Sequence, residues 1–263
     1  MRIGGLPVFQ SLLKDKKALV VGVANDQSIA WGCAKAFHAA GAQLAVTYLN
    51  EKAESFVRPL AESLDADIIE PLNVERSGDD ITLFNTIRER WGSIDILLHS
   101  IAFCPKDDLH GRVIDCSTDG FARAMDVSVH SFLRLLRLAE PLMSTGATAM
   151  TVTFYGSERV VADYNIMGPV KAALESVTRY AAAELGSQGI SVHALSPGPL
   201  ATRAASGIAH FDDMLAAAAA KAPTQTLATI EDIGAYATFL ASDGARNVTG
   251  CVHSIDGGYS MMS

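Results

Sequence analysis

The sequence contains little that would bind nucleic acid. Of its 263 residues 21 are Lys or Arg and 29 are Asp or Glu, so the net charge is -8 and the pI is near 5.3. Proteins that bind DNA or RNA usually display clustered cations. We therefore expect no nucleic-acid partner.

Signatures of metal sites and membrane segments are missing as well. The four cysteines form no CxxC pair and the seven histidines no HExxH motif, which predicts free thiols and no metal site. No apolar run reaches the roughly 18 residues that span a bilayer. Residues 1–17 lack the apolar stretch and cleavage site of a secretory signal. These absences favour a cytoplasmic protein without a membrane segment.

Apolar runs of strand length alternate with stretches of helical period along the chain, and no tract rich in Pro, Gly or Ser divides it. The strands are expected at 18–24, 43–48, 66–74, 93–102, 147–156, 191–198 and 250–259. The helices are expected at 28–42, 51–64, 78–92, 120–143, 171–186 and 229–242. Strands that are apolar on both faces indicate a parallel sheet covered on both sides. We predict one α/β domain over residues 1–263, a Rossmann-type doubly wound, seven-stranded, mostly parallel sheet whose ligand lies beyond the carboxyl ends of the strands.

The segment after the first predicted strand reads GVANDQSIAWG. Gly22 would let the backbone approach a pyrophosphate, and the free N–H groups of the following helix would hold its charge. A tight strand-to-helix turn without a ligand accounts for the same residues. The segment therefore indicates a dinucleotide site without excluding the simpler turn.

The next two strand ends concern the adenosine part of such a cofactor. Lys52 is the first cation after the second strand and comes only after Leu49. A 2'-phosphate requires a cation close to this strand end, so NADH is favoured over NADPH, although the usual acidic residue for a free 2'-hydroxyl is also missing. After the third strand Asn73 and Val74 could contact adenine, and a loop asparagine without that role would look the same.

About 17 residues separate the fourth predicted strand from the next helix, and a loop of this length is usually functional. It begins with Ser100, Ile101 and Ala102, which are small enough for a dinucleotide to cross the strand end. The preceding His99 is interpreted as a structural histidine rather than a catalyst.

Tyr164 and Lys171 are seven residues apart. On one helix they would share a face about 10.5 Å apart along the axis. A nearby ammonium would favour the phenolate and lower the pKa of the tyrosine. We expect Pro169, which lacks an N–H, to loosen the first helical turn. A buried tyrosine and an unrelated surface lysine would give the same spacing.

Several motifs together resemble the enoyl-acyl-carrier-protein reductases, a divergent branch of the short-chain dehydrogenase/reductases. The motifs are GVANDQSIAWG, HSIAF, YGSERVVADYNIMGPVKAALE, SPGPLATRAASGI and the closing DGG, in the family's order across nearly the whole chain. Ordinary short-chain dehydrogenases have Y-x3-K, so Y-x6-K combined with G-x5-S-I-A is specific to this branch.

The resemblance implies NADH-dependent reduction of the double bond of trans-2-enoyl thioesters during fatty acid elongation. Tyr164 would contact the thioester carbonyl and Lys171 would hold the nicotinamide ribose. The implied cofactor contacts are Gly22, Ser28, Ile29, Leu49, Asn73, Val74, Ser100, Ile101, Ala102, Lys171, Leu200, Ala201, Thr202, Arg203 and Ala204. The implied substrate contacts are Cys104, Tyr164 and Met167.

Phe154 departs from the family pattern. Many members have a second tyrosine at this position, ten residues before the first. Phe154, which we count with the catalytic positions, can pack on a substrate but cannot donate a hydrogen bond. The neighbouring Tyr155 is expected to face the other way if the strand continues this far.

Residues 200–222 resemble the family's substrate-binding lid. The resemblance also implies a homotetramer and an acyl-carrier-protein thioester as substrate. Because the lid is not basic, we expect either that an acidic carrier docks elsewhere, around Lys106, Arg112 or Arg159, or that the substrate is a coenzyme A or other atypical thioester.

Two other functions remain open. A 3-oxoacyl thioester or carbonyl reductase would pair its tyrosine with a serine thirteen residues earlier, where this chain has Thr151. A dinucleotide sensor without catalytic activity would keep the fold, and Phe154 is the one feature that suggests it.

Overall fold

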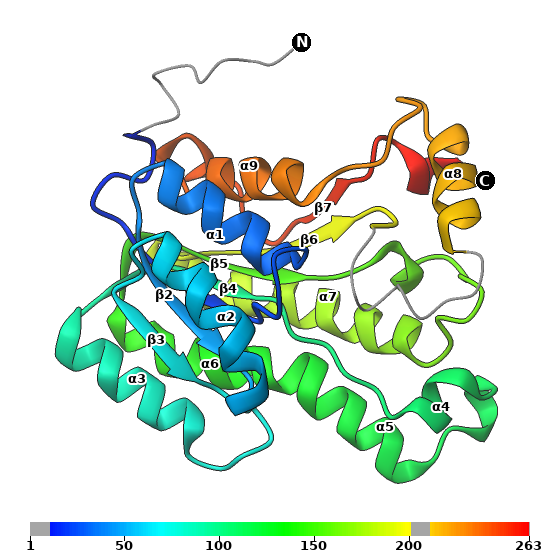
Figure 1. Cartoon of the computed structure of the whole chain (residues 1–263), viewed down its shortest axis with the longest axis horizontal. Helices are drawn as coiled ribbons and strands as arrows, with labels where there is room; N and C mark the ends of the chain where they lie inside the picture. The colour runs from blue at the N-terminus through cyan, green and yellow to red at the C-terminus, as the bar shows by residue number, and fades with distance from the viewer. Residues whose placement is uncertain (1–10, 201–210, 263) are drawn as a thin grey trace.

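The computed structural model describes residues 11–200 and 211–262, with side chains left out at 211–214. Within this part of the chain seven parallel strands form one sheet in the order β3-β2-β1-β4-β5-β6-β7 (Figure 1). The strands are β1 Lys17–Val21, β2 Gln43–Tyr48, β3 Ile68–Pro71, β4 Ile94–His99, β5 Met143–Val152, β6 Ser191–Pro197 and β7 Val252–Ile255. The predicted doubly wound α/β fold is confirmed.

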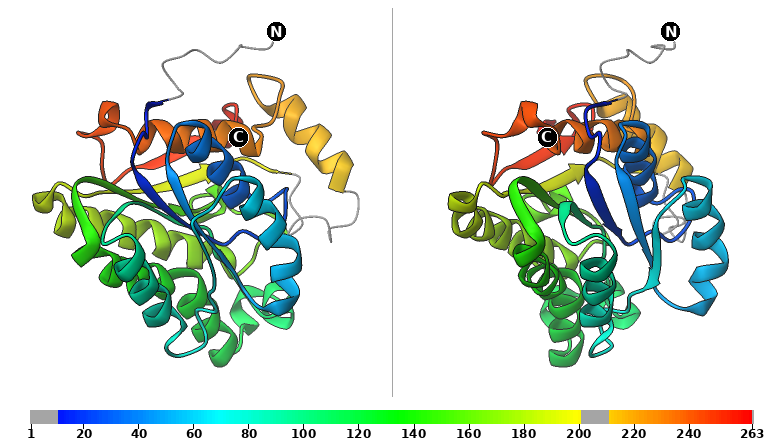
Figure 2. Two further views of the ribbon diagram at one scale, coloured as in Figure 1. Left: turned by 60° about the vertical axis from the view of Figure 1, so that its left-hand side comes forward. Right: turned by 90° about the vertical axis from the view of Figure 1, so that its left-hand side faces the viewer.

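Helices cover both faces of the sheet (Figure 2). The α-helices are α1 Ile29–Ala39, α2 Glu51–Ser63, α3 Asp79–Arg90, α4 Lys106–His110, α5 Thr118–Met125, α6 Ser131–Ala139, α7 Met167–Leu185, α8 Phe211–Lys221 and α9 Ile230–Leu240. One core cluster joins the sheet to α1, α2 and α9, and the other joins it to α3, α6 and α7. Strand residues alternate between the two clusters, as their period of two requires.

Small residues allow α1 and α9 to pack closely. A Cβ on Gly32 would collide with the carbonyl of Ile230, and a Cβ on Gly234 would collide with the carbonyl of Gly32. The N-terminus of α9 is capped, since the Thr229 side chain accepts from Asp232 N–H and the Asp232 carboxylate accepts from Thr229 N–H.

Most elements are shorter than predicted, and two of the differences bear on the site. The helix expected over 120–143 is divided into α5, a π-helical turn Asp126–His130 and α6. The strand expected to continue to residue 156 ends at Val152, which pairs with Leu195, while β4 has already ended opposite Thr151. Without a neighbouring strand on both sides the chain leaves the sheet and forms the 3-10 turn η5, Tyr155–Ser157.

The described residues contain no helix that is long and apolar enough to cross a membrane. Among the same residues no three His, Cys, Asp or Glu side chains gather as a metal site would require. All four cysteines are free thiols.

Candidate active site

The carboxyl ends of β1 and β4 meet at Gly22 and Ser100. Gly22 has φ +104, and a Cβ there would collide with the carbonyl oxygen of Ser100. Ser100 in turn donates its N–H to the carbonyl of Val21 at 2.9 Å. A glycine is therefore required at residue 22 by backbone packing alone, whether or not a ligand crosses the strand ends.

Ser28 and Ile29 form the beginning of α1. The Ser28 hydroxyl donates to the carbonyl of Asn25 at 2.7 Å and makes no cap hydrogen bond to the helix. Ile29 is the first helical residue and packs at the edge of the core. Since no side chain caps this helix, its first N–H groups are available to an anion such as a pyrophosphate.

The positions predicted for the adenosine end lie in loops after β2 and β3. Leu49 directly follows β2 and is 54% exposed. The Asn73 side chain accepts from the N–H of Glu75 at 3.0 Å, and the carbonyl of Val74 accepts from Arg134 at 2.6 Å. The side-chain oxygen of Asn73 is thus used in a local turn, as expected for a loop asparagine that does not contact a cofactor.

The loop after β4 contains more structure than its sequence indicated, because α4 and the 3-10 turn η2, Val113–Asp115, lie within it. It begins with the partly buried Ile101 and the exposed Ala102. Ser128, in the π-helical turn, accepts from the N–H of Phe103 at 3.0 Å and donates to its carbonyl at 3.2 Å. The sequence analysis missed Ser128, since only the three-dimensional fold brings it to the loop.

Cys104 follows in the same loop and is partly buried against the core. Burial, together with nearby Asp108 and Cys116, raises the pKa of the Cys104 thiol to about 11. The thiol is therefore protonated at neutral pH and acts as a small apolar group.

His99 is a structural residue, as predicted. It is fully buried, and its ring nitrogens form hydrogen bonds with the hydroxyls of Thr151 at 2.9 Å and Ser131 at 2.8 Å. Burial lowers the pKa of His99 to about 3, and the charges of Lys171 and Arg134 act in the same direction. A neutral, fully bonded imidazole of this kind does not transfer protons at neutral pH.

Lys171 is buried, with 5% of its surface exposed, so the interpretation as a surface lysine is wrong. Its Nζ donates to the carbonyl of Val152, at the end of β5, at 2.7 Å. Burial lowers the pKa of Lys171 to about 8, an effect that the Glu175 carboxylate partly offsets. Glu175 accepts from the Thr153 hydroxyl at 2.7 Å. The sequence analysis missed Glu175, although its place one turn after Lys171 was a usable signal.

Tyr164 lies outside the helix, so the expected shared helical face is wrong. Helix α7 begins at Met167, and Tyr164 lies in a turn between Asp163 with φ +61 and Asn165 with φ +42. Pro169 has no N–H and fits the first turn of a helix, where N–H groups have no helical acceptor. It therefore marks the start of α7 rather than a loosened turn further inside it.

Packing sets the position of the Tyr164 ring. The ring meets Phe154 at a centroid distance of 4.9 Å and an angle of 60°. Gly156 lies under the same ring, and a Cβ there would be 2.6 Å from Cδ1 of Tyr164. The side chain of Asn165 donates to the carbonyl of Leu109 at 2.6 Å and joins this turn to α4. The sequence analysis did not identify Gly156, because its partner is eight residues away across a turn.

The expected lowering of the pKa of Tyr164 is also wrong. Burial and the Glu175 carboxylate raise this pKa well above its usual value. Tyr164 is therefore a neutral phenol at physiological pH. In this form it donates a hydrogen bond, for which a phenolate would be unsuited.

The remaining predicted residues are placed as follows. Met167 is the first residue of α7 and is buried in the core cluster that joins the sheet to α3, α6 and α7. Leu200 follows β6 and is partly buried against the α1 and α9 side. The other four predicted cofactor contacts, at 201–204, lie outside the described residues.

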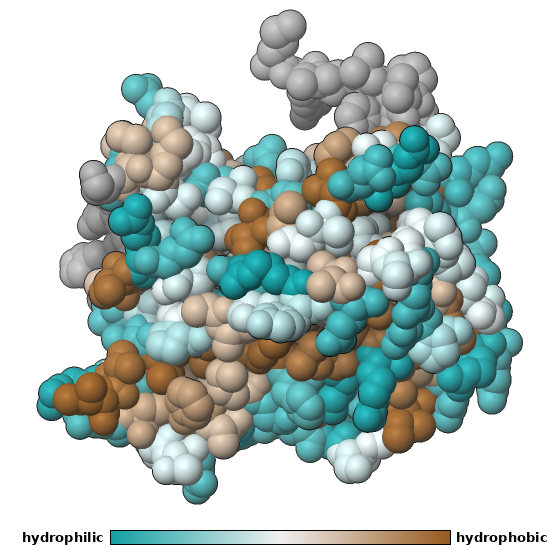
Figure 3. Space-filling model, turned by 180° about the vertical axis from the view of Figure 1, so that it is seen from behind, coloured by the Kyte–Doolittle hydropathy of each residue, from teal (hydrophilic) through white to brown (hydrophobic). Residues whose placement is uncertain are grey.

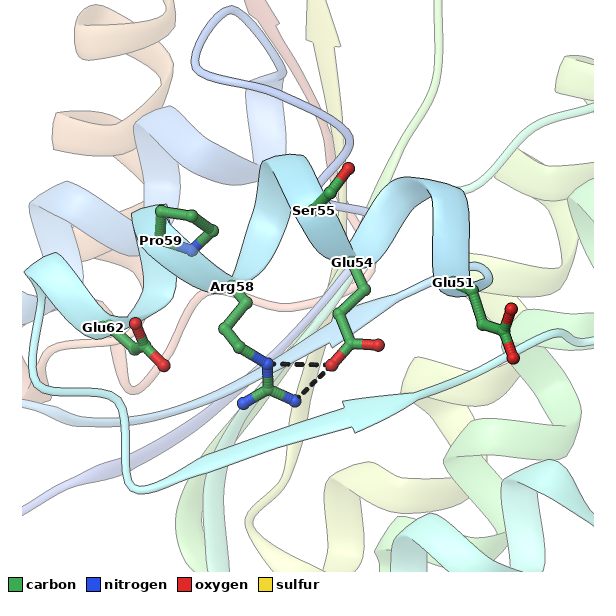
Figure 4. A pocket seen from close by; sticks show the side chains of 6 residues that line it. All are labelled: Glu51, Glu54, Ser55, Arg58, Pro59 and Glu62. Carbon is green, nitrogen blue, oxygen red and sulfur yellow. Dashed lines mark hydrogen bonds and ion pairs between the residues drawn. The ribbon is translucent and has the colours of Figure 1, made fainter.

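A shallow hollow lies on the outer surface of α2 (Figure 4). Its residues are Glu51, Glu54, Ser55, Arg58, Pro59 and Glu62, and Arg58 pairs with Glu54 at 2.6 Å. All six come from one face of one helix. The hollow contains none of the residues predicted for the site.

A doubly wound parallel sheet with a buried lysine and a phenol at its carboxyl edge defines a nicotinamide-dependent oxidoreductase of the short-chain dehydrogenase type. A family model described as "Enoyl-(Acyl carrier protein) reductase" matches residues 22–260. The chain belongs to this family.

The chain is 44% identical to "Enoyl-[acyl-carrier-protein] reductase [NADH] 2" of Rhizobium meliloti, over 96% of this chain and 94% of that protein. The crystal structure of the reductase from Anaplasma phagocytophilum in complex with NAD has a TM-score of 0.92 and 42% identity, and covers 96% of this chain and 97% of that chain. The Bacillus cereus reductase with NADP+ and indole naphthyridinone has a TM-score of 0.93 and 41% identity, covering 96% and 99%.

Proposed function

We propose that this chain reduces the 2,3 double bond of trans-2-enoyl thioesters of acyl-carrier protein with NADH, as a step of fatty acid elongation. The observation that carries the proposal is that a buried Lys171 bonds to Val152 at the end of β5, while the neutral Tyr164 packs on Phe154, two residues further on. The Rhizobium meliloti relative, 44% identical over nearly the whole chain, is named for this activity and for NADH.

The residues present fit a dinucleotide. Gly22 lies without a side chain directly after β1, α1 has an uncapped N-terminus, and the Lys171 ammonium group lies at the end of β5. In the proposal the first two hold the pyrophosphate and Lys171 holds the nicotinamide ribose. Bound NADH supplies the hydride that reaches the β-carbon of the substrate.

Tyr164 stabilises the charge that the reaction creates. When the β-carbon is reduced, negative charge develops on the thioester carbonyl oxygen. The neutral phenol donates a hydrogen bond to that oxygen, and a donor at such a position lowers the barrier by about 3–4 kcal/mol. Phe154 contributes no second hydroxyl and supports the Tyr164 ring by an edge-to-face contact.

The fold counts against a carbonyl reductase. Thr151, the residue that would assist the tyrosine in such an enzyme, is fully buried and its hydroxyl bonds to His99 at 2.9 Å. It lies in the ladder between β4 and β5. Thr151 is therefore part of the framework of the sheet.

The proposal extends to the assembly and its location. Phe121 of α5, Leu133 of α6 and Tyr180 of α7 are exposed apolar residues, and we assign them to the interfaces of the homotetramer that the resemblance implies. Apolar side chains are visible over several parts of the back of the molecule (Figure 3). Four free thiols fit a reducing compartment, so we place the tetramer in the cytoplasm.

The docking site for the carrier is a further part of the proposal. Arg112 pairs with Asp115 at 3.4 Å. Lys106 is exposed in the loop after β4, and Arg159 is exposed five residues before Tyr164 in the sequence. Because acidic residues accompany these cations, we expect their charge to contribute modestly, and a coenzyme A thioester to be accepted too.

NADH absorbance tests the proposal. The purified chain is given a 2-enoyl thioester, a 3-oxoacyl thioester, or neither, each with NADH and then with NADPH. Oxidation of NADH only with the enoyl thioester supports the assignment. Oxidation with the 3-oxoacyl thioester, or binding of NADH without turnover on any thioester, would reject it in favour of the carbonyl reductase or the sensor.

A further inference from the structure

The carboxyl-terminal motif DGG is not used by the proposed reaction. Gly257 and Gly258 follow Asp256 and have φ values of +64 and +85. The Asp256 carboxylate accepts from the N–H groups of Gly258 at 2.9 Å and Ser260 at 2.8 Å. The motif thereby forms a tight turn that presents Tyr259, the first residue of the 3-10 turn η8, Tyr259–Met261.

This turn holds the segment that follows α8. The N–H and the hydroxyl of Thr224 both donate to the carbonyl of Gly257 at 3.2 Å. A Cβ on Gly257 would collide with the Thr224 hydroxyl, and a Cβ on Gly258 would lie 2.9 Å from Pro223. The end of α8 is thus attached to the carboxyl-terminal turn, and the two lie side by side (Figure 1).

Tyr259 continues this attachment in two directions. Lys221, the last residue of α8, places its Nζ 5.4 Å from the centre of the Tyr259 ring, which is a cation–π contact. On the other side Tyr155 meets the ring edge-on at a centroid distance of 5.4 Å, and its hydroxyl donates to the Tyr259 hydroxyl at 3.4 Å. Tyr259 therefore connects α8 with the turn η5.

From η5 the contacts continue to Tyr164. The rings of Tyr155 and Phe154 lie 4.6 Å apart, and those of Phe154 and Tyr164 lie 4.9 Å apart, both edge-to-face. Edge-to-face pairs have a preferred geometry, so a shift of one ring displaces the next. Four aromatic rings thus form a continuous series from α8 to the phenol.

We propose that Tyr259 is a positioning residue that, through Tyr155 and Phe154, couples α8 to Tyr164. The inference rests on the proposed function, because α8 lies within the predicted substrate lid. In this arrangement α8 and the Tyr164 hydroxyl keep fixed relative positions. The acyl thioester needs this in order to bind with its carbonyl at Tyr164. The groups proposed to hold the pyrophosphate, Gly22 and the N-terminus of α1, are not part of this series of rings.

Steady-state kinetics of Tyr259→Ala tests the coupling. We expect the KM for the enoyl thioester to rise roughly 10-fold or more, because α8 loses its fixed place at the acyl site and the thioester binds less tightly. The KM for NADH should change by less than about twofold. Tyr259→Phe keeps the ring contacts and loses one hydrogen bond, so it should restore most of the affinity, leaving about a twofold to threefold loss. Equal changes of both KM values would show a merely structural role and overturn the proposal.

Tyr236→Phe is the matched control. It removes another phenol hydroxyl, that of Tyr236 on α9, which forms a hydrogen bond with Nδ1 of His253 at 3.0 Å. The KM for the thioester should stay unchanged in this variant. A rise equal to that of Tyr259→Phe would mean that any lost phenol hydrogen bond has the effect, which contradicts the coupling.

A double-mutant cycle identifies the partner. Tyr155→Phe and Tyr259→Phe each remove the same hydroxyl pair, so the double variant should be no worse than either single one. Additive losses would mean that the two hydroxyls act separately. These variants keep every ring and remain informative if Tyr259→Ala does not fold.

Amide hydrogen exchange gives a readout that does not depend on activity. In Tyr259→Ala we expect faster exchange at 215–222 and in the turn 162–166, with no change in α9. Should the chain turn over no thioester, this result alone would support the coupling and separate it from the proposed function. Unchanged exchange in both segments would refute it.

Discussion

Lys171 and Tyr164 lie at the same edge of the sheet but are held by different interactions. Lys171 lies inside α7, is 5% exposed and donates to a main-chain carbonyl of β5 at 2.7 Å. Tyr164 lies in the turn before α7, between two residues with positive φ, and the contacts that hold it are made by its ring.

The difference assigns a role to each residue. A buried ammonium bonded to the end of a strand keeps a fixed position and suits a fixed part of the cofactor, the ribose. A phenol held by its ring keeps its hydroxyl for the substrate carbonyl. The two roles can therefore be disturbed separately.

Tyr164→Phe should have the largest effect on turnover. Loss of the donor to the developing oxyanion is expected to lower kcat roughly 100- to 1000-fold. Thermal unfolding should be almost unchanged, because the ring contacts remain. Stopped assays with the enoyl thioester measure kcat, and calorimetry measures the thermal unfolding. Wild-type turnover in this variant would remove Tyr164 from the mechanism.

Gly156→Ala tests whether ring packing places the phenol. The added Cβ would lie 2.6 Å from the Tyr164 ring and displace it, which should lower kcat by about 10- to 100-fold. Gly186→Ala is the matched control, since a Cβ there meets nothing within 4 Å and the residue has helical φ -59. Equal activities of the two variants would disprove the packing argument.

Lys171→Met should act on the cofactor. Loss of a charged donor is expected to weaken NADH binding by about 10-fold or more, and the unpaired carbonyl of Val152 should lower the free energy of unfolding by about 1–3 kcal/mol. Lys35→Met, which removes only the exposed ion pair with Glu231, should change neither quantity measurably. Fluorescence titration and chemical denaturation provide the measurements.

The effect of pH on Lys171 should be smaller than the effects of these substitutions. It should change NADH affinity and the free energy of unfolding in opposite directions. Because burial lowers the pKa of Lys171 from 10.5 to about 8, the folded chain loses this proton first as pH rises. Between pH 8 and 10.5 the unfolded chain binds more protons, so the contribution of Lys171 to stability rises with pH. NADH affinity should fall over the same range, as the ammonium disappears. In Lys171→Met both trends should be absent, and their persistence there would assign them to another group.

The sequence predicted the framework well, because strand and helix periods are local properties. The apolar runs around β1 to β7 each produced a strand. The position of Tyr164 outside α7 was missed, since Gly168 and Pro169 fit either a loosened turn or the beginning of a helix.

The supporting residues were missed for a different reason. Ser128 reaches Phe103 and Gly156 supports Tyr164 only after the chain has folded. Burial and the Glu175 carboxylate raise the pKa of Tyr164, whereas the sequence spacing had drawn attention to Lys171. Such effects can be predicted only when the positions of side chains from several elements are known.

The dissociation constant of NADH, measured by fluorescence titration of the wild type, Tyr164→Phe and Lys171→Met, tests the division of roles most directly. We predict that Tyr164→Phe binds NADH as the wild type does, whereas Lys171→Met binds it about 10-fold more weakly or worse. Equal weakening in both variants, or wild-type binding by Lys171→Met, would contradict it.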